Sequence, residues 1–409
     1  MNEEFSGALK GLKVLDLTRA LAGPFCTMLL ADQGAEVIKV EAVGSGDGTR
    51  VMPPFRPDQQ DRLPYGGYFH SVNRNKQSVA IDLKAEEGKA LIRTLVQECD
   101  VLVENFRAGV MEGLGLSYES LAELNPRLVY ATIRGFGDPR TGESPYCHWP
   151  AYDVIAQSMG GMMSITGPAG GEPTKVGPGV GDLIPGALAA VGVLSAVYEA
   201  QRSGRGQFVD VAMYDAILAF CERMVPQYSF EGVVPGPVGN AHGALCPFGT
   251  FPASDGYVAI ACPGDNFWRL LCEEMGRPEL IEDERFRRNY HRTQHQEACV
   301  ALISDWTRQF TRKELASKLG GKIPFGPVQN VKDIFEDPHV AVRHLLAEVE
   351  QPGSATPVHI PDTPIKMTRT PGGVRRRAPL LGEDTDSVLR RYGLTDDQIA
   401  DLRARKIVG

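Results

Sequence analysis

Strand-like and helix-like segments alternate along the first 136 residues, and this alternation constrains the fold more than any other feature of the chain. Five short apolar runs have the composition of buried strands and cover residues 12–18, 36–41, 78–83, 100–106 and 129–136. Helical patterns lie at residues 24–33, 86–97 and 117–125, and an Ala-rich helix is predicted over 185–201. This order predicts an α/β fold, with a large Rossmann-like domain whose mostly parallel sheet carries helices on both faces.

The second half of the chain follows a different pattern. Residues 232–247 are rich in Gly, Pro and Val, which is typical of a linker, and residues 250–261 predict an antiparallel hairpin turning at 254–256. Because 409 residues are too many for one ordinary core, we expect more than one domain. We place the first part of the large domain in residues 1–225, a smaller α+β domain in 226–326 and a C-terminal segment in 327–409.

Charge and cysteine content limit the classes of function. The net charge of −8 argues against sequence-independent binding of nucleic acid, which needs an excess of Lys and Arg. The eight cysteines have neither disulfide-framework nor zinc-site spacing, so we expect reduced thiols and no metal. The polar first ten residues do not resemble a leader, and no apolar run approaches the ~20 residues of a membrane span. We therefore expect a cytoplasmic protein that does not enter a membrane.

Several polar residues stand where an α/β sheet binds ligands. The turn after the first strand lacks the G-x-G-x-x-G pattern, which argues against an ordinary dehydrogenase. Residues 73–76 form a polar, cationic loop suited to a phosphate, although a solvated loop explains the same residues. Asn105 and Phe106 end the fourth predicted strand, and Arg134 lies near the end of the fifth.

Asp182 follows three closely spaced glycines and precedes the predicted Ala-rich helix. Glycine lets another molecule approach the backbone closely, so this carboxylate is a candidate reactive group. A helix N-cap is the more ordinary role for an aspartate here, and the residues alone favour it. Residues 261–265, after the hairpin, are a candidate mobile flap or a simple strand–helix turn.

At this point the motifs resemble a known family, the class III CoA-transferases of the CaiB/BaiF type. The matching segments, in chain order, lie at residues 17–24, 34–41, 46–50, 73–76, 104–106, 152–153, 181–182, 209–211, 324–328 and 381–383. The resemblance implies that Asp182 is the catalytic nucleophile, which reverses the preference for a cap. It also implies a set of residues that contact CoA: Asn73, Asn75, Lys76, Asn105, Phe106 and Arg134.

The resemblance further implies an activity and an assembly. CoA would move from an acyl-CoA, such as the dicarboxylyl-CoA succinyl-CoA, to a free carboxylic acid through an aspartyl-CoA thioester on Asp182. Closure of the 261–265 flap would exclude water, and backbone N–H groups of the glycine-rich turn would stabilise the oxyanions. Both chain ends would build the large domain, so the segment 327–409 returns to it. Two chains would form an interlocked homodimer.

Three alternatives remain. Relatives of the α-methylacyl-CoA racemase type place a histidine where this chain has Tyr152, and a tyrosine cannot replace an imidazole that both takes and gives a proton near neutral pH. A formyl-CoA:oxalate-type transferase differs at Leu21, at Ala42 or Val43, and across residues 261–265. A CoA-thioester binder without catalysis is the third.

Overall fold

The computed structural model describes residues 7–58 and 65–409 and contains two compact units. The first unit takes in Met1–Met162, Val176–Pro226 and Ala341–Gly409, and the second takes in Met163–Lys175 and Gln227–Val340. Both ends of the chain therefore belong to the first unit. The domain boundaries expected from the sequence stay predictions.

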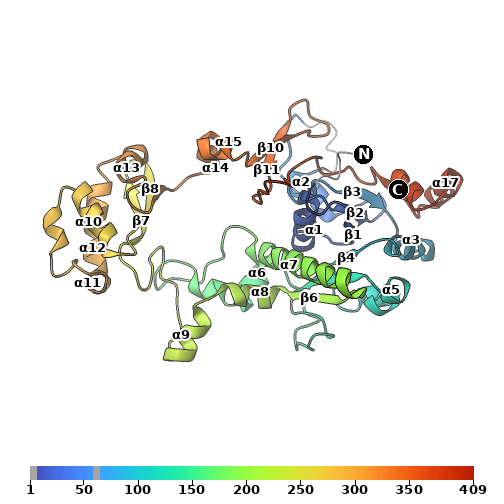
Figure 1. Cartoon of the computed structure of the whole chain (residues 1–409), viewed down its shortest axis with the longest axis horizontal. Coiled ribbons are helices and arrows are strands. Elements are labelled where there is room, and N and C mark those ends of the chain that lie inside the picture. Colours follow the sequence, from blue (N-terminus) through green and yellow to red (C-terminus); the bar gives the residue numbers. More distant parts are fainter. Residues whose placement is uncertain (1–6, 59–64) are drawn as a thin grey trace. The chain divides into compact units, whose positions relative to one another are not determined.

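The first unit is built on a six-stranded sheet in the order β3-β2-β1-β4-β5-β6, in which every neighbouring pair is parallel (Figure 1). The strands are β1 (Lys13–Asp16), β2 (Glu36–Glu41), β3 (Gln77–Ala80), β4 (Val101–Glu104), β5 (Val129–Arg134) and β6 (Phe208–Ala212). Five of them lie within one to three residues of the predicted runs, and β6 was not predicted. β1 to β5 are almost wholly buried, as expected for a sheet covered on both faces, and this includes polar side chains such as Lys39 and Ser78.

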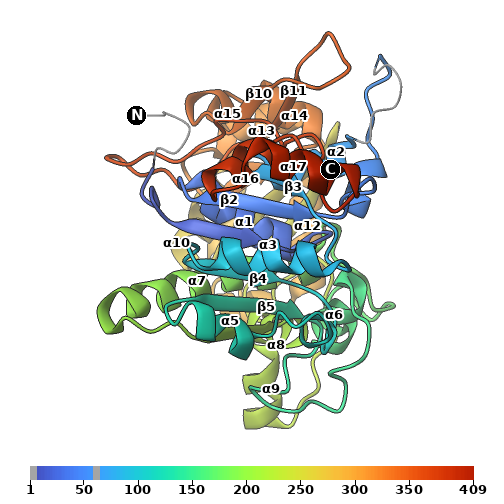
Figure 2. The same ribbon diagram turned by 90° about the vertical axis from the view of Figure 1, so that its right-hand side faces the viewer.

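Helices cover the two faces of this sheet. On one face an apolar core joins the strands to α3, α5, α16 and α17, so the C-terminal helices lie over the N-terminal strands (Figure 2). On the other face, α1 packs closely against α7. The helices of the unit are α1 (Ala22–Asp32), α2 (Gly67–Asn73), α3 (Glu86–Val96), α4 (Val110–Gly113), α5 (Tyr118–Leu124), α6 (Asp153–Met159), α7 (Val180–Ser203), α8 (Met213–Phe220), α16 (Thr385–Arg391) and α17 (Asp396–Ala404).

Helix α7 is longer than predicted, because it begins at Val180 and includes Pro185. Its Ala and Gly side chains allow the close contact with α1. By length and composition alone it could cross a membrane, a test that core helices of globular proteins also pass. Its contacts with α1, α8, β5 and β6 are those of a core helix.

The second unit is a small antiparallel sheet with helices. Strands β7 (Phe248–Ala253), β8 (Gly256–Ala261) and β9 (Phe325–Pro327) pair in that order, which confirms the predicted hairpin and its turn. Its helices are α10 (Asp265–Glu274), α11 (Asn289–Gln294), α12 (Gln296–Thr307), α13 (Arg312–Leu319) and α14 (Val331–Glu336). Residues of α10, α12 and α13 form an apolar core with the sheet, which includes Phe251, Trp268 and Leu271.

A few short elements complete the chain. Helices α9 (Met224–Glu231) and α15 (Pro338–Val342) stand where the chain passes between the units. Strands β10 (Leu346–Val349) and β11 (Val358–Pro361) form an antiparallel pair in the returning segment. Short 3-10 turns occur at Gly48–Val51, Met162–Ile165 and Pro278–Ile281.

Candidate functional site

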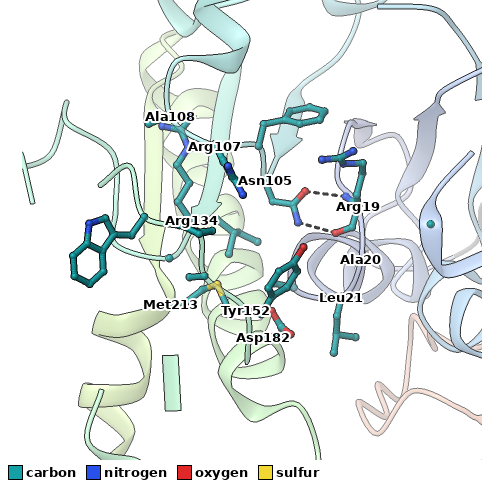
Figure 3. Close-up of a pocket in the computed structure, with 18 of the residues that line it drawn as sticks. Arg19, Ala20, Leu21, Asn105, Arg107, Ala108, Arg134, Tyr152, Asp182 and Met213 are labelled. Atoms are coloured by element: carbon teal, nitrogen blue, oxygen red, sulfur yellow. Dashed lines mark hydrogen bonds between the residues drawn. The ribbon is translucent and has the colours of Figure 1, made fainter. Parts of the chain in front are cut away.

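A pocket of about 430 Å3 opens at the carboxyl-terminal edge of the parallel sheet (Figure 3). Strand order reverses between β1 and β4, and the helices that follow these strands lie on opposite faces, which leaves a crevice where such sheets bind ligands. The lining residues come from the ends of β1, β4 and β5 and from the starts of α6, α7 and α8. They are residues 19–22, 47–49, 52, 105–108, 133–135, 147, 149–152, 182 and 213.

Asn105 fixes the loop after β1. Its Oδ1 accepts a hydrogen bond from the Arg19 N–H at 2.8 Å, and its Nδ2 donates to the Arg19 carbonyl oxygen at 2.8 Å (Figure 3). Ala20 follows with a φ of 64°, a conformation that costs free energy in a residue other than glycine. The predicted site residue Asn105 thus holds together the two strand ends that form the crevice.

Asp182 lies in the pocket, in the first turn of α7. The helix begins at Val180 and its N-cap is Gly179, so the interpretation of Asp182 as the N-cap is wrong. A Cβ at Gly181 would collide with the backbone of Asp153, which explains the glycine directly before Asp182. The Asp153 Oδ1 accepts a hydrogen bond from the Gly181 N–H at 2.8 Å, so the starts of α6 and α7 are fastened together.

The surroundings of Asp182 favour its protonated form. Burial raises the pKa of this carboxyl to about 7, and the charge of Asp153 adds to the rise, while a backbone hydrogen bond from Asp153 opposes it in part. Leu21 and Met213 are apolar lining residues of the same pocket. Across residues 7–58 and 65–409, no ion pair or side-chain hydrogen bond reaches Asp182. A perturbed carboxyl in a ligand-sized pocket is a candidate for covalent or acid–base chemistry.

Tyr152 stands beside Asp182 and is 70% exposed (Figure 3). It is the N-cap residue of α6 and directly precedes Asp153. None of the described residues that line this pocket is a histidine. The pocket as described therefore offers a carboxyl and a phenol but no imidazole.

Two more predicted residues line the pocket, and both have partners in the protein. The Arg134 guanidinium is paired with Glu104 at 2.7 Å and with Asp138, and little of its side chain is exposed. The Phe106 ring lies under the Arg19 guanidinium, 5.2 Å from ring centroid to Cζ. With Asp182 and Asn105, four of the seven predicted site residues are brought together here.

The other three predicted residues, Asn73, Asn75 and Lys76, lie outside the pocket and are buried. Lys76 Nζ donates to Asp16 Oδ2 at 3.0 Å, to the Pro24 carbonyl oxygen at 2.9 Å and to Asn73 Oδ1 at 2.9 Å. These bonds hold the first turn of α1 in place. Their contact with CoA stays a prediction, because their polar atoms face the protein interior in this structure.

The exposed cations of the site were not predicted from the sequence. Arg19 and Arg107 line the pocket, and within the described part of the chain neither has a carboxylate partner. A second pocket of about 220 Å3 lies at the carboxyl ends of β1, β2 and β3 and shares Arg19, Asp47 and Phe106 with the first. Exposed Lys84 lines it. Arg19, Arg107 and Lys84 all follow the ends of predicted strands, and this position was the signal in the sequence that could have identified them.

One predicted role stays a prediction. Backbone N–H groups of the glycine-rich turn were expected to stabilise oxyanions, and those of Val180 and Asp182 donate to carbonyl oxygens of the same turn while that of Gly181 donates to Asp153. Residues 261–265 belong to the second unit, where they form the turn between β8 and α10. Their role as a flap stays a prediction. In the described segments no group of three or more His, Cys, Asp or Glu could hold a metal ion.

Comparisons of the sequence and of the structure with known proteins point to one family. A family model described as CoA-transferase family III matches residues 9–385. The succinyl-CoA:mesaconate CoA-transferase of Haloarcula hispanica is 50% identical over 391 residues, which cover 95% of this chain and 97% of that protein. The succinate–glutarate CoA-transferase of Agrobacterium fabrum is 38% identical, covering 93% and 94%. A crystal structure of a CaiB/BaiF family protein from Brucella suis superposes with a TM-score of 0.84 at 36% identity, covering 95% and 100%.

Proposed function

The chain belongs to CoA-transferase family III and is a CoA-transferase, and on this premise we propose that Asp182 is its nucleophile. The donor we propose is a dicarboxylyl-CoA such as succinyl-CoA, since the similar proteins from Haloarcula and Agrobacterium are named for succinyl-CoA or succinate. The observation that carries the proposal is Asp182 itself: a carboxyl with a pKa of about 7, in a pocket at the sheet's switch point.

The proposed reaction consists of four balanced exchanges at Asp182. Its carboxylate attacks the donor thioester, the C–S bond breaks, and a mixed anhydride and CoA thiolate form. The thiolate attacks the Asp182 carbonyl and gives an aspartyl-CoA thioester and the free donor acid. The acceptor carboxylate displaces the thiolate to form a second anhydride, and the thiolate then attacks the acceptor's carbonyl and regenerates Asp182. Each exchange replaces one activated acyl bond with another, so the steps are nearly balanced in free energy.

Tyr152 is the donor that we propose for the oxyanion. The N–H groups of Val180, Gly181 and Asp182 already have acceptors, whereas the Tyr152 side chain lines the same pocket as Asp182 (Figure 3). A hydroxyl that points to the developing negative charge stabilises it most in a site from which water is excluded. Tyr152→Phe is expected to lower kcat about tenfold to a hundredfold with little change in acyl-CoA affinity.

The two pockets adjoin each other, because Arg19, Asp47 and Phe106 line both. We propose that the pantetheine arm reaches Asp182 in the larger pocket and that the adenosine 3′-phosphate occupies the smaller one, near Lys84. Arg19 lines both pockets and its guanidinium has no carboxylate partner in the described chain, so it suits the diphosphate between them. Lys84→Met is expected to weaken CoA binding about tenfold and dephospho-CoA binding much less.

An α-methylacyl-CoA racemase and an oxalate-specific transferase fit the described site less well. Racemisation needs an acid–base pair, and the described pocket residues supply Asp182 but no histidine. Leu21 presents an apolar side chain to the pocket, which disfavours an acceptor such as oxalate whose second carboxylate adjoins the first.

We also propose that two copies of the chain form the interlocked homodimer of the family. A stripe of exposed residues on α7, Val191, Leu194, Ser195 and Tyr198, recurs at helical spacing. Val191 is 61% and Tyr198 64% exposed, so a second copy would bury apolar surface here. A cytoplasmic location is also proposed, and the free thiols of all eight cysteines suit a reducing compartment.

The test combines substrate profiling with trapping. Donor thioesters are mixed with a panel of carboxylic acids, and the CoA products are read by mass spectrometry. Asp182→Ala is expected to abolish transfer while CoA still binds in a calorimeter. Wild-type protein quenched in acid is expected to carry CoA on the peptide that contains Asp182. Transfer by the Asp182→Ala protein would refute the proposed nucleophile, and binding of CoA without transfer by the wild type would support a non-catalytic binder.

A further inference from the structure

Gln157, on α6, is a buried amide that connects this helix to the segment before α7. Its Nε2 donates to Asp153 Oδ1 at 2.7 Å, and its Oε1 accepts from the Val176 N–H at 2.9 Å. The Gln157 side chain is fully buried, while its two partners are partly exposed. Rotating the amide by 180° would set two donors against each other at Val176, and this orientation is therefore fixed.

Asp153 receives two hydrogen bonds on the same oxygen. Besides Gln157, the Gly181 N–H donates to Oδ1 at 2.8 Å. Asp182 differs, because no side-chain donor and no cation within the described chain reaches it. Of the two neighbouring carboxyls, Asp153 is therefore the one that hydrogen bonds from Gln157 and Gly181 hold in place.

The distance between the two carboxyls is set by the backbone. The starts of α6 and α7 approach so closely that no side chain fits at Gly181, whose added Cβ would meet the Asp153 carbonyl oxygen, Cα and carbonyl carbon. Asp153 therefore cannot move away from Asp182 without breaking its bonds to Gln157 and Gly181. The close packing of the two helix starts therefore keeps the Asp153 and Asp182 carboxyls near each other.

We propose that Gln157 is a positioning residue for Asp182: its buried amide holds the Asp153 carboxyl beside Asp182, so that acylation of Asp182 relieves a repulsion built into the site. This inference rests on the proposed role of Asp182 as nucleophile. When Asp182 becomes an anhydride or a thioester it loses its negative charge and is no longer repelled by Asp153. The covalent states are then stabilised relative to the free carboxylate, which favours attack on the donor.

The groups that face Asp182 agree with this division of roles. Asp153 on α6 is the charge that raises the pKa of Asp182 after burial itself. From α2, the Tyr68 phenol has a raised pKa because of burial and then the charges of Asp182, Asp153 and Asp47. The pocket residues contributed by the start of α1, Leu21 and Ala22, and by α8, Met213, are uncharged. Asp153 and Asp182 therefore determine the charge in the part of the pocket around Asp182.

The first test measures the titration of Asp182 without using the reaction. Infrared difference spectra of wild type against Asp182→Asn identify the carboxyl band of Asp182, which is then titrated. The band is expected to half-titrate near pH 7 in the wild type. In Gln157→Met, Asp153 loses the amide that holds it beside Asp182, and the Asp182 midpoint is expected to fall by about one pH unit. Asp153→Asn keeps an acceptor for Gly181 but removes the charge, and the midpoint falls by about two units.

The second test measures turnover. Gln157→Met is expected to lower kcat about tenfold and to leave the KM for acyl-CoA within about twofold, with the acidic limb of the pH–rate profile moved to lower pH. Gln33→Met removes another buried amide, one that bonds Thr363, and serves as the control for packing and folding. Its kcat and its Asp182 titration are expected to match the wild type.

The outcomes separate the two proposals. An unmoved Asp182 titration in folded Gln157→Met, or equal losses in Gln33→Met, would overturn the positioning role. The expected titrations in a wild-type protein that transfers no CoA would instead refute the proposed function and leave the role of Gln157 intact.

Discussion

Two aspartates of the same unit, Asp16 at the end of β1 and Asp182 at the start of α7, have opposite environments. Asp16 is fully buried, and its two oxygens accept hydrogen bonds from the Thr18 N–H and hydroxyl, the Thr27 hydroxyl and Lys76 Nζ. Burial would raise its pKa, but the charges of Lys76 and Lys39 and these hydrogen bonds hold it at about 2. Asp182 has no such partners, and its pKa rises to about 7.

The difference distinguishes a carboxylate that stabilises the fold from a carboxylate that can react. A carboxylate that is satisfied on all sides stabilises the fold and is a poor nucleophile, because its lone pairs are occupied. A carboxylate buried without a cation destabilises the fold and keeps its lone pairs available. The polar loop at residues 73–76 supplies Lys76 to Asp16, so this conspicuous motif supports the start of α1, which in turn lines the Asp182 pocket.

The largest expected effect is the loss of transfer on changing Asp182. Asp182→Asn removes the nucleophile and is expected to lower kcat by about 10⁴-fold or more while the protein stays folded. Asp16→Asn leaves Lys76 buried without a counter-charge and is expected to prevent accumulation of folded protein. Steady-state kinetics and circular dichroism of both variants check the contrast. A folded, active Asp16→Asn protein would contradict it.

A smaller effect is expected on stability when the cation of Asp16 is removed. Lys76→Met leaves Asp16 buried and unpaired, and breaking a buried pair costs about 3–5 kcal/mol of unfolding free energy. Urea unfolding followed by fluorescence measures this cost. Surface pair Lys13–Glu98 provides the control, because Lys13→Met is expected to cost less than about 1 kcal/mol. A specific loss of CoA affinity in the folded Lys76→Met protein would instead support the family-implied contact with CoA.

The pH dependence of stability is expected to have opposite signs at the two sites. Asp182 binds its proton more tightly in the folded state than when unfolded, so its contribution weakens the fold as pH rises from about 4 to about 7. Above pH 7 the penalty is at most about 4 kcal/mol, and Asp182→Asn is expected to stabilise the protein at pH 8 but not at pH 4. The stabilisation from Asp16 is present above its unfolded pKa and is lost as pH falls through about 2.

Urea unfolding of wild type and Asp182→Asn at pH 4, 6 and 8 tests this sign. Equal stability differences at all three pH values would show that Asp182 titrates normally, and the contrast with Asp16 would then fail.

Much of the fold was predictable because short segments rich in Val, Ile and Leu alternate with helical patterns along the chain. The predictions for β1 to β5 differ from the structure at the ends only, and the 36–41 strand has the predicted bounds. β6 was missed because its sequence, Phe208–Ala212, contains Asp210 and is only partly buried. Helix α7 was predicted to begin after Asp182 because Pro185 and the glycines are poor helix formers, but in the structure Pro185 lies inside the helix, which forgoes one backbone hydrogen bond there.

The site was only partly predictable, because tertiary contacts decide which polar residues reach the pocket. Asn105, Phe106 and Arg134 follow strand ends and line it, whereas Asn73, Asn75 and Lys76 turn inward to Asp16 and Asp32. The pairing of Asp153 with Asp182 joins residues 29 positions apart through a close helix approach, which no local pattern indicates.

The smallest effect concerns a single hydrogen bond to Asp16. Thr27→Val keeps the shape of the side chain but removes the hydroxyl that donates to Asp16 Oδ2 at 2.7 Å, and it is expected to cost about 1 kcal/mol of unfolding free energy. Transfer activity is expected to stay within about twofold of wild type, because Lys76 still holds Asp16 and Thr27 does not line the pocket. Thr94→Val, which removes an exposed hydroxyl on α3, is expected to change stability by less than about 0.5 kcal/mol.

Urea unfolding and steady-state kinetics on the same preparations measure both quantities for Thr27→Val. A loss of transfer out of proportion to the loss of stability would show that the Asp16 network tunes the reaction. The separation between a structural aspartate and a reactive one would then not hold, because removing one neutral hydrogen bond from Asp16 would have altered the chemistry at Asp182.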